Sequence, residues 1–308
     1  MVSVIIPNYN HAQYLDERIQ SVLNQTYKDF EVIILDDCST DNSLEVINKY
    51  KNYPHVTQIV VNKPNCGSPF KQWHKGFELA KGDIIWIAES DDYCEPTFLE
   101  RLTTAMSQRE DCVVAFCKIL SFEPNGCKRI STPLELQEGI YESKIFISDF
   151  MSWHPTIVNA SGAIFKRSIA MAIDNRYLNF RGAGDRMFWV EMAEQGSIAY
   201  VDIPLNYFRQ HNSNSSSRNF NSGTNQREDK IILDYIYQKG FINDEKYNHC
   251  RTRYIHRWIL PISNQILRFQ LLTIWEPKFS KRLRFLYAVS KIRLFLRSIL
   301  GKKDTDKC

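Results

Sequence analysis

The feature that most constrains the fold is the regular alternation of apolar runs and helical patterns in the first part of the chain. Runs rich in β-branched residues predict four strands, at residues 2–7, 30–37, 55–62 and 83–88. Between the first two runs, apolar residues recur at helical spacing, at Leu15, Ile19, Val22 and Leu23. Continuous apolar strands that alternate with helices are typical of a parallel sheet covered on both faces. We therefore predict an α/β fold with a mostly parallel sheet flanked by helices.

Acidic residues directly follow two of these predicted strands. Asp36 and Asp37 end the second run, and Glu89, Asp91 and Asp92 come immediately after the fourth. Ligand sites of parallel α/β sheets lie beyond the carboxyl ends of the strands, so these side chains are expected to converge on one edge. Carboxylates this close repel one another unless a cation lies among them, and hard oxygen ligands suit Mg²⁺ or Mn²⁺. Taken alone, each cluster is equally compatible with a solvated acidic turn or a helix cap.

The composition excludes several classes of protein. The 308 residues suffice for one large domain or two ordinary ones, and no stretch approaches the roughly 18 apolar residues of a membrane span. No secretory signal precedes the first apolar run, which predicts a cytoplasmic protein. None of the eight cysteines belongs to a C-x-x-C pair, so a zinc site is not expected.

Positive charge is concentrated near the C-terminus. Residues 278–303 contain nine Lys or Arg and no Asp or Glu, whereas the rest of the chain is slightly acidic. Such asymmetry points to a local anionic partner and not to nucleic acid. An apolar stripe predicts a basic amphipathic helix over about 281–301, flanked by Arg284, Lys291, Arg293 and Arg297. This helix suits an anionic membrane surface, and the alternative is that it packs on the rest of the protein.

Three motifs occur in an order and spacing that resemble the family-2 glycosyltransferases of the GT-A fold. They are VSVIIPNYN, SVLNQTYKDFEVIILDDCSTDNS and GDIIWIAESDD, and the resemblance continues more loosely through GAGDRMFW and YFRQH. It implies a nucleotide-sugar-binding and catalytic domain at residues 1–211. The Ser- and Asn-rich segment 212–226 is expected to be a mobile loop, and residues 227–308 are expected to form a helical C-terminal region.

The resemblance also implies roles for individual residues at the nucleotide. The turn formed by Pro7, Asn8 and Tyr9 would pack against the nucleotide, and Asp37 would contact its base. These positions follow the first and second predicted strands, so they belong to the same expected edge of the sheet.

The motif ESDD at residues 89–92 corresponds to the family's site for the ribose and for a divalent metal, Mn²⁺ or Mg²⁺, on the diphosphate. Asp91 and Asp92 match the family pattern directly, whereas Glu89 stands where many members have Asp. His211 in YFRQH would complete the metal shell, with Arg209 nearby for the phosphate charge.

The family's catalytic base is an acidic residue just before a helix, and Asp185 in GAGDRMFW occupies the matching position. The turn from Gly182 to Gly184 would let the acceptor approach closely, and Glu191 is the next candidate base. Four further side chains are compatible either with an acceptor cleft or with ordinary core and turn positions: Trp153, His154, Asn159 and Ser161.

These assignments predict an inverting, metal-dependent glycosyltransferase of the hexosyltransferase type. Its donor would be a nucleotide sugar, with a UDP-sugar preferred, and its acceptor a saccharide or lipid-linked saccharide in bacterial surface polysaccharide synthesis. A nucleotidyltransferase is the first alternative, but PNYNHAQY lacks the Gly- and basic-rich phosphate loop that such an enzyme needs. A non-catalytic nucleotide-sugar binding module is the second, and the position of Asp185 argues against it.

Overall fold

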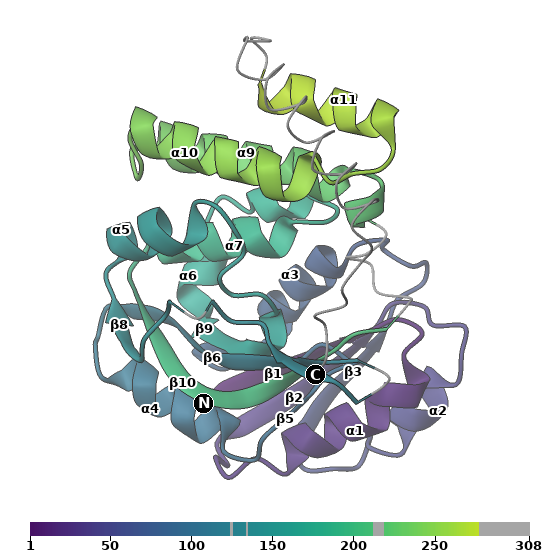
Figure 1. Cartoon of the computed structure of the whole chain (residues 1–308). Helices are drawn as coiled ribbons and strands as arrows, with labels where there is room; N and C mark the ends of the chain where they lie inside the picture. The colour runs from purple at the N-terminus through teal and green to yellow at the C-terminus, as the bar shows by residue number, and fades with distance from the viewer. Residues whose placement is uncertain (124–125, 134, 212–218, 277–308) are drawn as a thin grey trace. The chain divides into compact units, whose positions relative to one another are not determined.

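The computed structural model describes residues 1–123, 126–133, 135–211 and 219–276 (Figure 1). The chain forms two compact units. The first contains Met1–Ile147, Pro155–Asn179 and Gly184–His211, and the second contains Ser148–His154, Phe180–Ala183 and the described residues after 211. Two short segments of the predicted 1–211 domain therefore belong to the second unit. The reason is that hydrogen bonds with Glu228 and Lys246 tie these segments to the helices of that unit.

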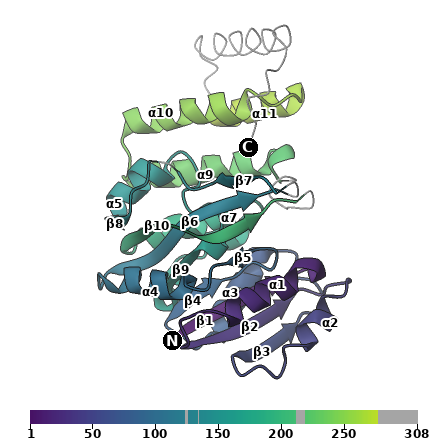
Figure 2. The ribbon, with the colours of Figure 1, turned by 60° about the horizontal axis from the view of Figure 1, so that its bottom comes forward.

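Ten strands of the described chain form one sheet in the first unit. They are β1 (Val2–Asn8), β2 (Phe30–Asp36), β3 (Val56–Val61), β4 (Ile84–Ile87), β5 (Tyr93–Cys94), β6 (Cys112–Phe122), β7 (Lys128–Ile130), β8 (Gly139–Tyr141), β9 (Ala163–Lys166) and β10 (Ser197–Arg209). Their order is β3-β2-β1-β4-β9-β6-β10-β5, with β7 paired to β6 and β8 paired to β10. Figure 2 shows β3, β2, β1 and β4 side by side.

The direction of the strands changes along the sheet. β1 is parallel to β2 and β4, β2 is parallel to β3, and β10 is parallel to β6. β9 lies between β4 and β6 and is antiparallel to both. The predicted α/β fold with helices around a parallel central sheet is confirmed. The antiparallel insertion of β9 adds a mixed second half, which local sequence patterns did not indicate.

Helices and short helical segments connect these strands. They are α1 (Ala12–Leu23), α2 (Ser43–Asn48), α3 (Pro69–Leu79), α4 (Phe98–Ser107), α5 (Ser143–Ile145), a π-helical segment (Phe146–Met151), two 3₁₀ segments (Ala160–Gly162 and Arg176–Asn179), α6 (Arg167–Ala172) and α7 (Gly184–Ala193). On β1, Val2, Val4 and Ile6 belong to a core that includes side chains of α1 and α4. Ile5 faces the other way, where it meets Gly76 of α3 so closely that a Cβ there would lie 2.6 Å from it. Both faces of the sheet are therefore covered.

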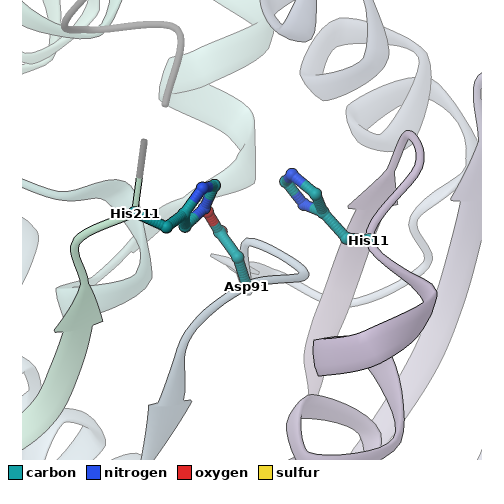
Figure 3. Close-up of side chains that lie close together, drawn as sticks. All are labelled: His11, Asp91 and His211. Atoms are coloured by element: carbon teal, nitrogen blue, oxygen red, sulfur yellow. The ribbon is translucent and has the colours of Figure 1, made fainter. Parts of the chain in front are cut away.

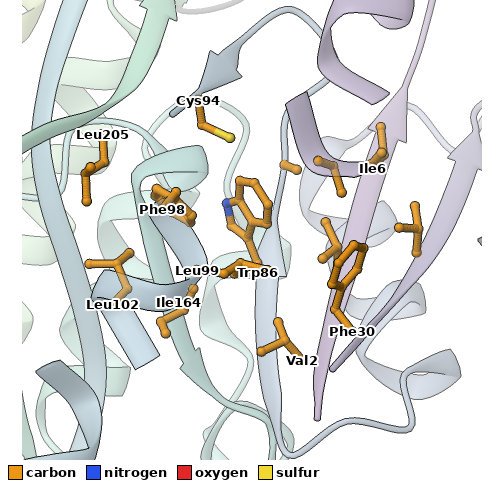
Figure 4. Packing of buried hydrophobic residues seen from close by; sticks show 14 of the residues in the cluster. Val2, Ile6, Phe30, Trp86, Cys94, Phe98, Leu99, Leu102, Ile164 and Leu205 are labelled. Atoms are coloured by element: carbon orange, nitrogen blue, oxygen red, sulfur yellow. The ribbon is translucent and has the colours of Figure 1, made fainter. Parts of the chain in front are cut away.

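The core beneath the acidic turn is built around Trp86 of β4. Its ring stacks on Phe98 of α4 at 4.5 Å between centroids, and its indole N–H donates to the backbone oxygen of Ser161. Figure 4 shows this ring among Cys94 and Ile164 and the side chains of α4. The strand that ends in the acidic turn is thus anchored immediately before the turn.

The second unit is helical in its described C-terminal part. It contains α9 (Thr224–Gln238), α10 (Asp244–Tyr254), a π-helical segment (Ile255–Ile259) and α11 (Gln265–Trp275). The loop predicted over 212–226 is wrong at its end, because α9 already begins at Thr224 and buries Gln226 within its first turn. Residues 212–218 and the predicted basic helix at about 281–301 lie outside the described residues. In the part of the chain that is described, no helix has both the length and the apolar character needed to cross a membrane.

Candidate active site

The turns after β1 and β2 brace each other. The side-chain amide of Asn8 donates to Oδ2 of Asp36 at 2.8 Å. Asn10 has a left-handed backbone (φ 57), which Asn tolerates well. Its Oδ1 accepts from the amide of Thr40 at 2.7 Å, and its own amide donates to Oγ of Ser39 at 3.0 Å. The two predicted nucleotide motifs therefore form one rigid rim at the carboxyl ends of neighbouring parallel strands.

Asp37 is held by a loop that the sequence analysis did not include. Its Oδ1 accepts from the side-chain amide of Asn62 at 2.7 Å and from the backbone amide of Cys66 at 2.9 Å. The thiol of Cys66 lies 3.2 Å from Oδ2. The other predicted nucleotide positions differ in access, because Pro7 is buried within β1 and Tyr9 is exposed.

Two histidines and one carboxylate come together at this edge of the sheet. Within the described residues, His11, Asp91 and His211 are the group whose potential ligand atoms all lie within 4.8 Å of one another (Figure 3). Nε2 of His211 lies 2.9 Å from Oδ2 of Asp91. Nδ1 of His11 lies 2.8 Å from Oγ of Ser90, and this contact orients its ring. Two imidazoles and a carboxylate fit a divalent ion such as Mn²⁺.

The pKa shifts of Asp91 and His11 favour an ionised carboxylate and a neutral imidazole, the forms that bind a cation. Burial alone would raise the pKa of Asp91, but the hydrogen bond with His211 and the nearby imidazoles of His11 and His211 outweigh it and lower that pKa. Burial lowers the pKa of His11, which favours the neutral imidazole that binds metals. His11 was missed by the sequence analysis. The available signal was a metal-ligand residue type directly after the PNYN turn.

Asp92, which was predicted as a metal ligand, is not part of this cluster. Its side chain is buried, with Oδ2 accepting from Oγ of Ser161 at 2.7 Å and from Nδ2 of Asn159 at 2.9 Å. Oδ1 accepts from the amide of Arg209 at 3.0 Å. Burial, followed by the charge of Asp91, raises the pKa of Asp92 to about 6. Asn159 and Ser161, left open between acceptor cleft and core, are buried supports of the acidic turn.

Arg18 supplies a positive charge beneath the acidic motif. It lies on the buried face of α1, and its Nε donates to the backbone oxygen of Glu89 at 2.9 Å. Its guanidinium lies 5.6 Å from the centre of the Trp86 ring. The sequence analysis missed this residue. The available signal was an arginine within the apolar stripe formed by Leu15, Ile19 and Val22.

Glu89 is tied to α3. Its Oε1 accepts from the indole N–H of Trp73 at 2.8 Å. Burial, followed by the charge of Asp91, raises the pKa of Glu89 to about 8. The protonated form reduces the number of like charges that must coexist in this turn.

Arg209, which was predicted to lie near the phosphate charge, contacts several groups around the acidic turn. Its Nε donates to the backbone oxygen of Asp91 at 2.9 Å, and its guanidinium forms an ion pair with Glu17. The guanidinium packs against the rings of Tyr14 and Phe122, and Cζ of Arg209 lies 4.6 Å from the centre of each ring. Arg209 therefore fixes the backbone at Asp91, a member of the cluster with His11 and His211.

Asp185 lies in the first turn of α7 and is partly accessible, with Oδ1 accepting from the amide of Arg186 at 2.8 Å. Glu191, the next candidate base, is only 2% exposed and lies 3.4 Å from Nε of Arg176. A Cβ at Gly182 would lie 1.9 Å from Oδ1 of Asn225, so packing within the second unit also favours glycine at this position.

Residues 3–173, more than half of the chain, match the sequence profile of the family described as glycosyl transferase family 2. The protein belongs to this family of glycosyltransferases. The putative teichuronic acid biosynthesis glycosyltransferase TuaG of Bacillus subtilis is 28% identical over 200 residues, which cover 65% of this chain and 75% of that protein.

Solved structures share the fold. TarS 1-349 of S. aureus, in complex with UDP-GlcNAc, superposes with a TM-score of 0.66 at 18% identity, covering 94% of this chain and 79% of that chain. The mannosyltransferase PcManGT from Pyrobaculum calidifontis, in complex with GDP-Man and Mn²⁺, gives a TM-score of 0.59 at 16% identity, covering 98% and 81%. The predicted family and GT-A type of fold are confirmed.

Proposed function

We propose that this glycosyltransferase is inverting and metal-dependent and that it takes a hexose from a UDP-sugar. The observation that carries the proposal is the cluster of His11, Asp91 and His211 beyond the carboxyl ends of the strands. The complexes of TarS with UDP-GlcNAc and of PcManGT with GDP-Man and Mn²⁺ support a nucleotide sugar and a divalent ion. We assign the cluster to the ion on the donor diphosphate.

The residues of the chain divide the chemistry between them. Asp37 accepts a hydrogen bond from the base of the donor. His11, Asp91 and His211 would hold a divalent ion, which would supply positive charge at the diphosphate. The diphosphate leaves with the electron pair of the broken glycosidic bond. Asp185 accepts the proton of the acceptor hydroxyl while that oxygen forms the new bond to the anomeric carbon. Attack from the face opposite the diphosphate inverts the configuration at that carbon.

The acceptor in this proposal is a saccharide or a lipid-linked saccharide of a bacterial surface polysaccharide. TuaG is named for teichuronic acid biosynthesis, which supports this class. The cationic run at 278–303 lies outside the described residues, and its sequence supports contact with an anionic leaflet at the cytoplasmic side. Enzyme and lipid-linked acceptor would then meet at the same surface.

The test is a donor screen that measures nucleotide release with and without acceptor, in Mn²⁺, in Mg²⁺ and in EDTA. We expect UDP release from one UDP-sugar, dependent on the ion, and a product whose anomeric proton signal by NMR shows inversion. Release of pyrophosphate would indicate a nucleotidyltransferase instead. Tight donor binding without any turnover would indicate a non-catalytic module, and full activity in EDTA would refute the metal assignment.

A further inference from the structure

Three consecutive backbone amides converge on one carboxylate in the second unit. The amide of Arg181 donates to Oε1 of Glu228 at 2.7 Å, and the amides of Gly182 and Ala183 donate to Oε2 at 2.8 and 2.7 Å. Successive amides that point to one side form an anion-binding nest. Hydrogen bonds to a charged acceptor are about twice as strong as neutral ones. Glu228 on α9 therefore fixes the backbone of this turn.

Other groups of the second unit hold the same turn. The backbone oxygen of Arg181 accepts from Nδ2 of Asn219 at 3.0 Å. The space beside Gly182 is filled by Asn225, which leaves no room for a side chain at that position. The three amides and the Arg181 carbonyl of the turn are hydrogen-bonded, and the space beside the α-carbon of Gly182 is filled. The residues that make these contacts lie on α9 or just before it.

The chain passes from this turn directly into α7. Ala183 is followed by Gly184, which lies so close to Phe70 that a Cβ would come within 2.4 Å of its ring. Asp185 is the next residue. Its backbone is therefore flanked by a fixed turn on one side and by close packing on the other. A general base must lie within hydrogen-bond reach of its proton donor, and a misplacement of about 1 Å costs on the order of a hundredfold in rate.

We propose that Glu228 is a positioning residue for the transfer reaction, because its carboxylate fixes the turn 181–183 and thereby the orientation of Asp185. This inference rests on the proposed role of Asp185 as the base. It gives the helical region after the catalytic part a function in acceptor activation, while donor binding depends on other residues.

The experiment compares Glu228→Ala and Glu228→Gln with a matched control, Asp229→Asn, in the full-length protein. Asp229 is the next residue on α9, and its carboxylate accepts from the hydroxyl of Tyr254, so the control removes a carboxylate contact away from the turn. For Glu228→Ala we expect kcat for transfer to fall by about ten- to a hundredfold, with the donor KM within about twofold of wild type. Glu228→Gln keeps one acceptor oxygen, so its kcat should lie between those of Glu228→Ala and the wild type. A Glu228→Ala enzyme as fast as the control would overturn the proposal.

Two further readouts separate positioning from general stability. In an Asp185→Asn background, Glu228→Ala should cause no further loss of transfer, because both changes act through the same group. A multiplicative loss would refute the proposal. Hydrogen–deuterium exchange needs no activity. We expect faster exchange at amides 181–183 in Glu228→Ala than in Asp229→Asn, and unchanged protection would also refute it. If the wild type transfers no sugar, the proposed function fails while the exchange result still decides whether Glu228 fixes this turn.

Discussion

The guanidinium of Arg18 lies 3.9 Å from Oδ2 of Asp92, and neither side chain is exposed to solvent. The pair joins α1 to the turn that follows β4, which also carries Asp91 of the cluster with His11 and His211. It explains how consecutive carboxylates are tolerated in this turn, since one of them faces inward to a fixed cation. Removing one partner of a buried ion pair leaves the other charge uncompensated, which is more costly than the pair itself is favourable.

Asp92→Asn should therefore lower stability more than it lowers metal binding. We expect a loss of about 3 kcal/mol in the free energy of unfolding, because Arg18 keeps its charge without a partner. Asp91→Asn should show the reverse, with a small change in stability and no Mn²⁺ binding. Urea unfolding and Mn²⁺ titration in the presence of UDP measure the two quantities. If Asp92→Asn abolished Mn²⁺ binding at unchanged stability, Asp92 would be a ligand after all.

Removal of the metal should abolish transfer, and added Mn²⁺ should restore it. His11→Ala and His211→Ala should each weaken Mn²⁺ binding by at least about tenfold, because each removes one of the candidate ligands. His55→Ala is a suitable control, since this half-buried histidine bonds to the backbone of Phe30 instead. Calorimetric titration of Mn²⁺ into each variant with UDP present measures these changes in affinity. Normal Mn²⁺ affinity in His11→Ala would show that His11 is not a ligand, which would leave only Asp91 and His211 as candidates.

Asp185→Asn should reduce the transfer rate by at least about a hundredfold while donor affinity changes little, because the amide keeps the shape but cannot accept the proton. Single-turnover transfer and UDP-sugar binding separate the two effects. Near-normal transfer by the Asn variant would mean that another group takes the proton. Glu191 is then the next residue to test, despite its burial.

Glu191 should make the stability of the protein depend on pH. Burial raises its pKa from an ordinary value of 4.5 to about 7. The folded state therefore keeps the proton between these values while the unfolded state loses it. Stability contributed by the protonated group is fully present below about pH 4.5 and is lost as pH rises through about 7, by up to about 3 kcal/mol.

Glu191→Gln should remove this dependence, so that the variant gains stability relative to wild type as pH rises from about 5 to about 7.5. Glu245→Gln, at an exposed position of α10, serves as the control. Urea unfolding at several pH values measures the difference. Parallel stability curves for wild type and Glu191→Gln would show that Glu191 titrates normally.

The cationic run at 278–303 should bring the protein to anionic vesicles. Each Lys or Arg near such a surface contributes on the order of 1 kcal/mol, less at high salt. Removal of residues 278–308 should release the protein while leaving donor hydrolysis largely intact, and Arg284, Arg293 and Arg297 changed to Glu should act alike. Co-sedimentation with neutral and anionic vesicles at two salt concentrations is the measurement. An insoluble truncated protein together with a full-length protein that ignores vesicle charge would support packing instead.

The parallel strands could be predicted because their pattern is local. β1, β2 and β4 are buried by helices on both sides, so their sequences are nearly continuous in apolar residues. The direction and place of β9 could not be predicted, because its pairing with β4 joins residues as far apart as Ile84 and Lys166. A short apolar run carries no information about which strand it will pair with or in which direction.

The sequence by itself determined that carboxylates gather after β4 and that His211 belongs with them, because the motif order resembles a known family. Only the tertiary structure decided which carboxylate faces outward. Asp91 and Asp92 are adjacent in the chain, yet one meets His211 from 120 positions away and the other meets Ser161 and Arg18 in the interior. Neighbouring side chains in a turn point in different directions. Their roles are therefore fixed by the groups that folding places on each side, and these groups come from distant parts of the sequence.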